Sequence, residues 1–231
     1  MSMQCDLLNV DWQKIKAVIF DVDGTLYDQR KLRRLMLLEL LRYYLTHLGE
    51  LQDFKILRDF RREREKRAFE VVVDLDNAQY DWVARSSGVS PERVRRVVRK
   101  WIFKVPLRHL PSCSYPSILR VFDNLSLRGI ATATFSDYPA DEKLAVLGLA
   151  PQCNVCATER DIGRLKPDPE GLFAVAETLR VSVKHCLFIG DRDDRDGECA
   201  RRAGMPYLIL ERNSGMNYLF ETLNAELEMV K

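Results

Sequence analysis

A short apolar run that ends in two alternating acids constrains this chain more than any other stretch. Ala17 to Phe20 is unbroken apolar sequence, and Asp21-Val22-Asp23-Gly24-Thr25 follows it directly. Such a run, bounded by a turn signal, is typical of a strand buried on both faces. Alternate side chains of an extended chain point the same way, so Asp21 and Asp23 share the carboxyl end of that strand. Open α/β sheets bind ligands there, and acids in such a place are costly unless they are paired, metal-bound or reactive.

Charge is distributed unevenly along the 231 residues, whose total net charge is only +2. Residues 28–108 hold 20 Lys and Arg against 12 Asp and Glu, a local net charge of +8. The rest of the chain is therefore net acidic. This asymmetry indicates two units with different electrostatic roles, and the length is sufficient for one large core with a smaller appended unit.

The segment after Thr25 has helical periodicity for some eighty residues. Apolar positions recur every 3.6 residues from Lys31 to Leu48, and a second such pattern starts at Leu51 and continues through a charged run to Val72. A third helix is expected over Asn77–Arg85, and Ser90-Pro91-Glu92 is the start signal of a fourth. We predict that residues 28–111 form a helical bundle inserted after the first strand, which we call the cap.

From Pro116 onward, predicted helices and strands alternate, which is typical of a parallel sheet with helices on both faces. We therefore predict an α/β protein with a Rossmann-like, doubly wound core made of residues 1–27 and 112–231. The predicted strands are Ile130–Phe135, Asn154–Thr158, Cys186–Ile189 and Pro206–Leu210, and the predicted helices are Pro116–Arg128, Asp141–Leu147, Pro169–Arg180, Glu198–Arg202 and Met216–Met229.

Further polar residues follow the later strands. Ser136 and Asp137 come after one strand, Lys166 precedes a helix, and Asp191 and Asp196 follow another strand. In a doubly wound sheet these positions converge on the crevice that already holds the first two acids. Four carboxylates with one lysine need a cation, and a small set of hard oxygen ligands favours Mg²⁺.

These motifs, in this order and spacing, resemble the haloacid dehalogenase superfamily in its phosphatase branch. The resemblance covers residues 16–27 and about 112–210, and the helical insertion is similar to the cap of phosphoglycolate phosphatase and β-phosphoglucomutase. It implies a Mg²⁺-dependent phosphomonoester hydrolase that acts on a small phosphorylated metabolite through an aspartyl-phosphate. Asp21 would be the nucleophile, Asp23 the general acid and base, and Lys166 a cation paired with Asp21 and the phosphoryl group. Dehalogenases lack an acid at the Asp23 position, so its presence favours a C–O–P bond.

The resemblance also implies the ligand-binding residues. Asp191 would bind Mg²⁺ together with Asp21 and the backbone carbonyl of Asp23, and Asp196 would be a ligand or would orient the ligands. Phosphate would be bound by Ser136, Lys166, the backbone of Asp137 and the turn at Gly24. Many relatives have Asn where this chain has Asp137, and a carboxylate aimed at phosphate would be repulsive, so we expect it to point elsewhere. Thr25 is expected to cap the following turn.

Several other polar residues have simpler interpretations. Asp193 and Asp194 are expected to be solvated loop charges with Arg192 and Arg195 as local counter-ions. The run Arg61–Arg67 is interpreted as a solvated helix face paired with Glu63, Glu65 and Glu70. Cys153 and Cys156 are expected to be structural, which a reducing cytoplasm fits.

Other functions remain open on the sequence alone. A phosphosugar mutase would use the same fold and residues, and a phosphonate hydrolase would need a cap lysine, for which Lys55 is the candidate. A third alternative is a non-catalytic protein that binds nucleic acid through the basic stretch Arg93–Lys100, although no nucleic-acid motif is visible. We expect a cytoplasmic monomer or homodimer that takes a small phosphorylated substrate, with no nucleic-acid partner and no membrane association.

Overall fold

The chain is described by a computed structural model that covers residues 10–210 and 216–229. These residues form a parallel sheet of five strands in the order β3-β2-β1-β4-β5. The strands are β1 (Ala17–Phe20), β2 (Ala131–Ser136), β3 (Cys153–Cys156), β4 (Cys186–Gly190) and β5 (Tyr207–Ile209). The predicted parallel α/β core is confirmed, and the strand ends differ from the predicted ones by at most two residues.

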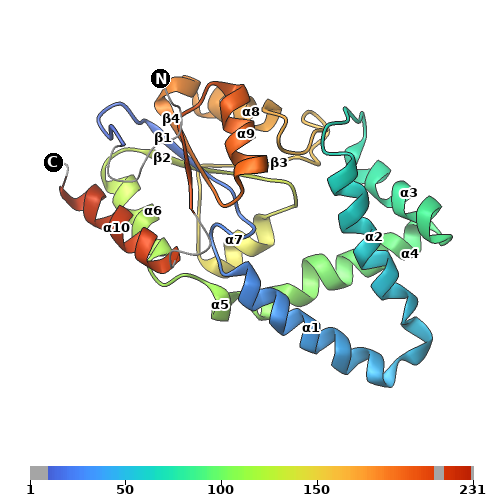
Figure 1. Cartoon of the computed structure of the whole chain (residues 1–231). Helices are drawn as coiled ribbons and strands as arrows, with labels where there is room; N and C mark the ends of the chain where they lie inside the picture. Colours follow the sequence, from blue (N-terminus) through green and yellow to red (C-terminus); the bar gives the residue numbers. More distant parts are fainter. Residues whose placement is uncertain (1–9, 211–215, 230–231) are drawn as a thin grey trace.

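Side chains of the central strand alternate between two helical layers. Val18 and Phe20 pack into the cluster that includes α6 (Ile118–Leu127) and α10 (Met216–Met229). Ala17 and Ile19 face the other layer, which contains α8 (Glu170–Leu179) and α9 (Glu198–Ala203). Figure 1 shows these helix pairs on opposite faces of the sheet. Because both faces are covered, β1 is apolar at every position and all four of its residues are fully buried.

The inserted helices leave the sheet after β1 and return before α6. They are α1 (Gln29–Thr46), α2 (Gln52–Lys66), α3 (Leu75–Ser87), α4 (Pro91–Val98) and α5 (Leu110–Cys113), and α7 (Asp141–Leu147) follows β2. Figure 1 shows α2, α3 and α4 grouped beside the sheet, with α1 along one edge of the molecule. The domain limits at residues 28 and 111 stay a prediction. Contacts between the two segments that connect the cap to the core support it. Tyr27 forms an antiparallel bridge with Ser114, and the Asp28 N–H donates to the Cys113 carbonyl at 2.8 Å.

Local capping explains where these helices begin and end. The Ser90 hydroxyl accepts from the Arg93 N–H at 3.3 Å and Pro91 occupies the first turn of α4, as the sequence predicts. Gly88 ends α3 in the left-handed conformation. The expected extension of α2 to Val72 is wrong, because α2 ends at Lys66 and the chain turns to bury Ala68 with the core residues Ile162 and Leu165.

The segment between α4 and α5 continues as a π-helical stretch, Arg99–Lys104, and a 3₁₀ turn, Val105–Arg108. It lies against α1, where the rings of Trp101 and Tyr43 meet edge to face with centroids 5.1 Å apart. This contact packs α1 against the return segment. Among the described residues, no helix combines the length and apolarity that crossing a membrane requires.

Candidate active site

The parallel register brings the ends of three strands together. Phe20 of β1 pairs with Thr134 of β2 on one side and with Ile189 of β4 on the other. The residues just beyond these pairs line one cavity of about 660 Å³ between the sheet edge and the cap. All the side chains predicted for the site except Gly24 line it, namely Asp21, Asp23, Ser136, Asp137, Lys166, Asp191 and Asp196.

Lys166 joins acids from both ends of the chain. Its buried ammonium donates to Asp21 Oδ1 and, at 2.7 Å, to Asp196 Oδ1. The other oxygen of Asp196 accepts the backbone N–H groups of Asp191 and Arg192 at 3.1 and 3.0 Å. Asp196 is therefore fully engaged in holding the turn after β4 and the lysine. The sequence left its role open, and this geometry favours a positioning role.

Thr25 supports the first acid rather than the following turn. Its hydroxyl donates to Asp21 Oδ2 at 3.0 Å, so the expectation that Thr25 caps the next turn is wrong. Thr25 can reach back to Asp21, four residues earlier, because Gly24 between them has a φ of +107° and turns the backbone. A Cβ atom at Gly24 would lie 2.3 Å from Asp191 Oδ2, so this close approach also requires glycine.

Three buried carboxylates meet in a geometry that fits a divalent cation. Asp21, Asp191 and Asp196 each place one oxygen within 4.8 Å of the other two. Lys166 supplies one positive charge against three negative ones at this point. Hard oxygen donors with an excess of negative charge fit Mg²⁺ in ligand type and charge.

Electrostatics make Asp21 costly to ionise without such a cation. Burial raises its pKa; Lys166 opposes this, and the neighbouring Asp196 and Asp191 raise the pKa further, so that the balance lies well above the ordinary value. Burial would lower the pKa of Lys166, but Asp196 and Asp21 outweigh it and raise that pKa. The lysine is thus held in its charged form between two acids.

Asp23 lies in a separate polar network that sequence inspection missed. Its carboxylate accepts from the Tyr27 hydroxyl and from the ammonium of Lys143 on α7. Burial alone would raise the pKa of Asp23, but Lys143 and Tyr27 outweigh it and lower the pKa. Tyr27 belongs to the same turn, whereas Lys143 is 120 residues away and lies on an ordinary helical stretch. Lys143 can be recognised as a site residue only from its burial beside the crevice, and burial depends on the tertiary structure.

The loop after β2 is held by both the core and the cap. The Ser136 hydroxyl accepts from the Tyr138 N–H at 3.2 Å. The Asp137 carboxylate accepts from the backbone N–H of Lys166 at 3.0 Å, although Asp137 also lines the cavity. The Asp137 carbonyl accepts from Arg64 of α2, whose guanidinium stacks 4.2 Å from the Tyr138 ring.

Arg64 corrects the interpretation of the charged run in α2. We expected Arg61–Arg67 to be a solvated face, but Arg64 is only 4% exposed and contacts the core. Glu65, assigned to the same solvated face, instead pairs across to the core with Arg195 and, at 3.0 Å, with Arg192. These contacts dock the cap over the cavity. The arginine periodicity in the sequence could not distinguish a face that contacts solvent from one that contacts a second unit.

The loop charges after β4 agree only in part with the prediction. Asp194 is exposed and pairs with Arg192 at 2.7 Å, as expected, and Asp193 is exposed as well. Asp193 pairs with Arg201 at 2.9 Å, however, and Arg195 pairs with Glu65 of the cap, so the expectation that Arg195 is a counter-ion of these loop acids is wrong.

Cys153 and Cys156 are both buried free thiols, and burial raises the pKa of each. Both findings fit the structural role predicted for these cysteines.

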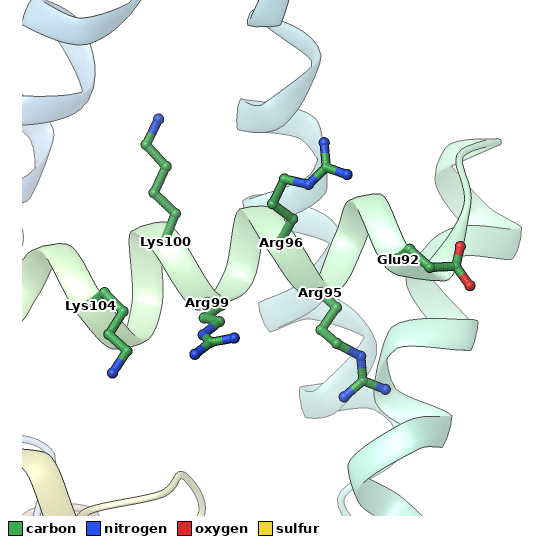
Figure 2. A pocket seen from close by; sticks show the side chains of 6 residues that line it. All are labelled: Glu92, Arg95, Arg96, Arg99, Lys100 and Lys104. Atoms are coloured by element: carbon green, nitrogen blue, oxygen red, sulfur yellow. The ribbon is translucent and has the colours of Figure 1, made fainter.

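A second hollow, of about 500 Å³, follows the basic stretch from Glu92 to Lys104. Figure 2 shows its side chains fanning out to different sides of the helix rather than converging on one point. Several cations there already have partners: Arg95 contacts Asn77 at 2.5 Å, Lys104 contacts Glu142, and Lys100 lies 3.5 Å from the centre of the Tyr43 ring. This arrangement gives the nucleic-acid alternative no specific support.

Comparison with known proteins identifies the family. A model of haloacid dehalogenase-like hydrolases matches residues 15–204. The chain belongs to this family. The match spans the crevice and the inserted helices, and it confirms both the predicted resemblance and the predicted enzyme class.

Relatives of this haloacid dehalogenase-like hydrolase include named phosphatases. A glyceraldehyde 3-phosphate phosphatase of Methanopyrus kandleri is 27% identical over 206 residues, which cover 86% of this chain and 84% of that protein. A phosphoglycolate phosphatase of Xylella fastidiosa is 36% identical over 66 residues, 29% of this chain and 28% of that protein. The crystal structure of a 2-haloacid dehalogenase from Pseudomonas syringae pv. tomato DC3000 superposes with a TM-score of 0.60 at 19% identity, covering 92% of this chain and 99% of that one. This last likeness concerns the fold alone.

Proposed function

We propose that this chain is a Mg²⁺-dependent phosphomonoester hydrolase that forms an aspartyl-phosphate on Asp21. One observation carries the proposal: Asp21, just after β1, and Asp196, in the turn after β4, meet around Lys166 in a cavity that cap residues also line. The phosphatase names of the relatives support the reaction type. The small phosphorylated metabolite expected from the sequence stays the proposed substrate.

Asp21 and Asp191, with the backbone carbonyl of Asp23, would hold Mg²⁺, and Asp196 would orient them through Lys166 and the turn. When bound, the ion neutralises negative charge on the carboxylates and on the phosphoryl oxygens. The excess of negative charge among the buried acids is the observation that fits such an ion.

The first chemical step transfers the phosphoryl group to the protein. A carboxylate oxygen of Asp21 forms a bond to phosphorus as the bond to the leaving oxygen breaks, and Asp23 gives that oxygen a proton. Binding an anionic substrate beside Asp23 raises the pKa of Asp23, because a nearby negative charge disfavours its ionised form. This counters the influence of Lys143 and Tyr27 and prepares Asp23 to act as the acid.

The second step returns the enzyme to its starting state. Asp23, now ionised, takes a proton from water, and the resulting oxygen attacks phosphorus and displaces the Asp21 carboxylate as inorganic phosphate forms. Ser136, the backbone N–H of Asp137 and the turn at Gly24 would hold the phosphoryl oxygens. Lys166 would stabilise their charge from the buried side, where preorganised charges act most strongly.

The decisive experiment compares wild-type protein with Asp21→Asn on a generic aryl phosphate with Mg²⁺. We expect the variant to lose phosphate release to the background rate, since an amide is a poor nucleophile. Exposed Asp123→Asn on α6 is the matched control and should retain full activity. Undiminished turnover by Asp21→Asn would remove the proposal.

The alternative chemistries make different demands on the cap. A phosphonate hydrolase would need Lys55 in the cavity, but Lys55 is exposed and is not among the residues that line it. A phosphosugar mutase shares all the site residues, so product analysis with a sugar monophosphate separates isomer from inorganic phosphate. The cytoplasmic location and the monomeric or homodimeric state stay predictions.

A further inference from the structure

The cap contributes a group of apolar side chains to the lining of the cavity. One wall comes from α1 and includes Leu32, Met36 and Leu40. Further apolar lining comes from the segment between α4 and α5 and includes Trp101, Ile102 and Leu107. Figure 1 shows α1 on the cap side of the sheet edge, beside the segment that leads back to the core.

The spacing on α1 makes its wall continuous. Leu32, Met36 and Leu40 follow one another at intervals of four residues and therefore form a single stripe along the helix. Eight residues of α-helix span roughly 12 Å, so the stripe is long compared with a two- or three-carbon group. The opposite side of α1 carries Leu38, which is 64% exposed and does not line the cavity.

Cations with assigned contacts cluster beside the acids. Lys166 contacts Asp21, Lys143 contacts Asp23, and Arg64 contacts the carbonyl of Asp137. These contacts hold three positive charges close to the acids, beside the proposed position of the phosphoryl group. The lining thus combines a cluster of acids and cations with a group of apolar cap side chains, and Gln29, Arg33 and Arg61 of the cap line the cavity as well. Charged and apolar lining in one cavity is the pattern of a site that binds an amphipathic ligand.

We infer that the substrate is a phosphomonoester whose leaving group is an extended alkyl or aryl alcohol, rather than a short polyol or hydroxy acid. This rests on the proposed hydrolase function of the same site. The phosphate would lie against Asp21 and Lys166, and the apolar part would lie between α1 and Trp101. A volume of about 660 Å³ lies within the range of cavities that enclose molecules well above the size of a two-carbon phosphoester.

The test measures phosphate release from ethyl, butyl and hexyl phosphate, with glycerol phosphate as the polar comparison and Mg²⁺ present throughout. Each methylene that enters an apolar wall should raise kcat/KM roughly three- to fourfold, from the transfer free energy of one methylene. We expect a rising series from ethyl to hexyl phosphate, with glycerol phosphate below butyl phosphate.

Two variants of α1 test whether the dependence on chain length arises in this cavity. Leu40→Gln, at a half-buried position that tolerates a polar group, should lower kcat/KM for hexyl phosphate by roughly three- to tenfold and leave ethyl phosphate little changed. Leu38→Gln on the outer side of α1 should keep the wild-type dependence on chain length. A shallower dependence on chain length in Leu40→Gln, beside the wild-type dependence in Leu38→Gln, places the alkyl group in this cavity.

The outcomes separate the two proposals. Phosphate release that is flat or falls with chain length would overturn the inference about the leaving group and leave the hydrolase intact. An equal dependence on chain length in Leu40→Gln and wild-type protein would also overturn it. Release from every ester at the level of Asp21→Asn would instead refute the hydrolase itself.

Discussion

Replacing Asp21 with asparagine should stabilise the protein when metal is absent, although the same change abolishes the proposed activity. Oxygens of Asp191 and Asp196 lie within 4.8 Å of one on Asp21. At an effective dielectric constant near 20, each such like-charge pair costs roughly 3.5 kcal/mol. The ion pair with Lys166, at a typical hydrogen-bond length of about 3 Å, offsets roughly 5.5 kcal/mol.

The balance disfavours an ionised Asp21 by about 1–2 kcal/mol at these separations. Asp21→Asn removes that charge at nearly constant shape, so the free energy of unfolding in EDTA should rise by a similar amount. For a chain of this size the midpoint of thermal unfolding would rise by roughly 2–8 °C. Added Mg²⁺ should stabilise wild-type protein more than the variant, because a bound ion stabilises only the folded state that binds it and the variant lacks one ligand.

The pH dependence of stability independently tests whether an ionised Asp21 destabilises the folded protein when metal is absent. Burial and the neighbouring acids raise the pKa of Asp21 in the folded state, against the opposing effect of Lys166. An acid with a raised pKa binds its proton more readily in the folded chain, so its contribution to stability falls as pH rises above about 4. The stability difference between Asp21→Asn and wild-type protein in EDTA should therefore widen from pH 4 toward neutrality.

Urea unfolding followed by tryptophan fluorescence, in EDTA and in Mg²⁺, measures these differences, with Asp123→Asn as the control. A variant that is equally destabilised in EDTA and in Mg²⁺ would refute the reasoning about charge crowding. If the variant is folded, more stable and inactive, loss of activity cannot be attributed to unfolding.

Three further predictions concern the same site and its surroundings. Gly24→Ala should lower kcat at least tenfold, a level typical of misplaced catalytic groups. The new Cβ would lie 2.3 Å from an Asp191 oxygen and would displace that side chain. A steady-state phosphate assay tests this. Lys143→Met should raise the pKa of Asp23, because it removes a cation that lowers that pKa. Carbon-13 NMR titration of the Asp23 side chain measures the change, and an unchanged pKa would contradict the ion pair. Cys186 should resist iodoacetamide in the native protein at neutral pH, because burial raises the pKa of its thiol to about 11, and rapid alkylation found by mass spectrometry would contradict its buried position.

Features that depend on local sequence were predicted well. The strand at Ala17–Phe20, the cap of α4 at Ser90 and the limits of α7 and α10 all follow from apolar periodicity and from residues within one turn. The convergence of the acids also followed from a general rule, because the carboxyl ends of parallel strands meet at one edge of a sheet.

Features that depend on what faces a helix were not predicted. Arg64 and Glu65 appear as two members of a charged run, yet both contact the core when the cap docks. Lys143 appears as a surface lysine of a short helix, yet it is 7% exposed and contacts Asp23. A charged residue on an amphipathic helix has the same local pattern whether water or another part of the chain lies opposite.

The sequence by itself determined which side chains could do chemistry and that they would meet, because strand endings and turn residues are set by interactions among neighbours. Only the tertiary structure decided how those side chains are held and what shape of cavity they serve. The pairing of Lys166 with two distant acids, the docking through Arg64 and the apolar wall formed by α1 all depend on contacts between segments far apart in the chain, whose registration is set by packing of the whole molecule.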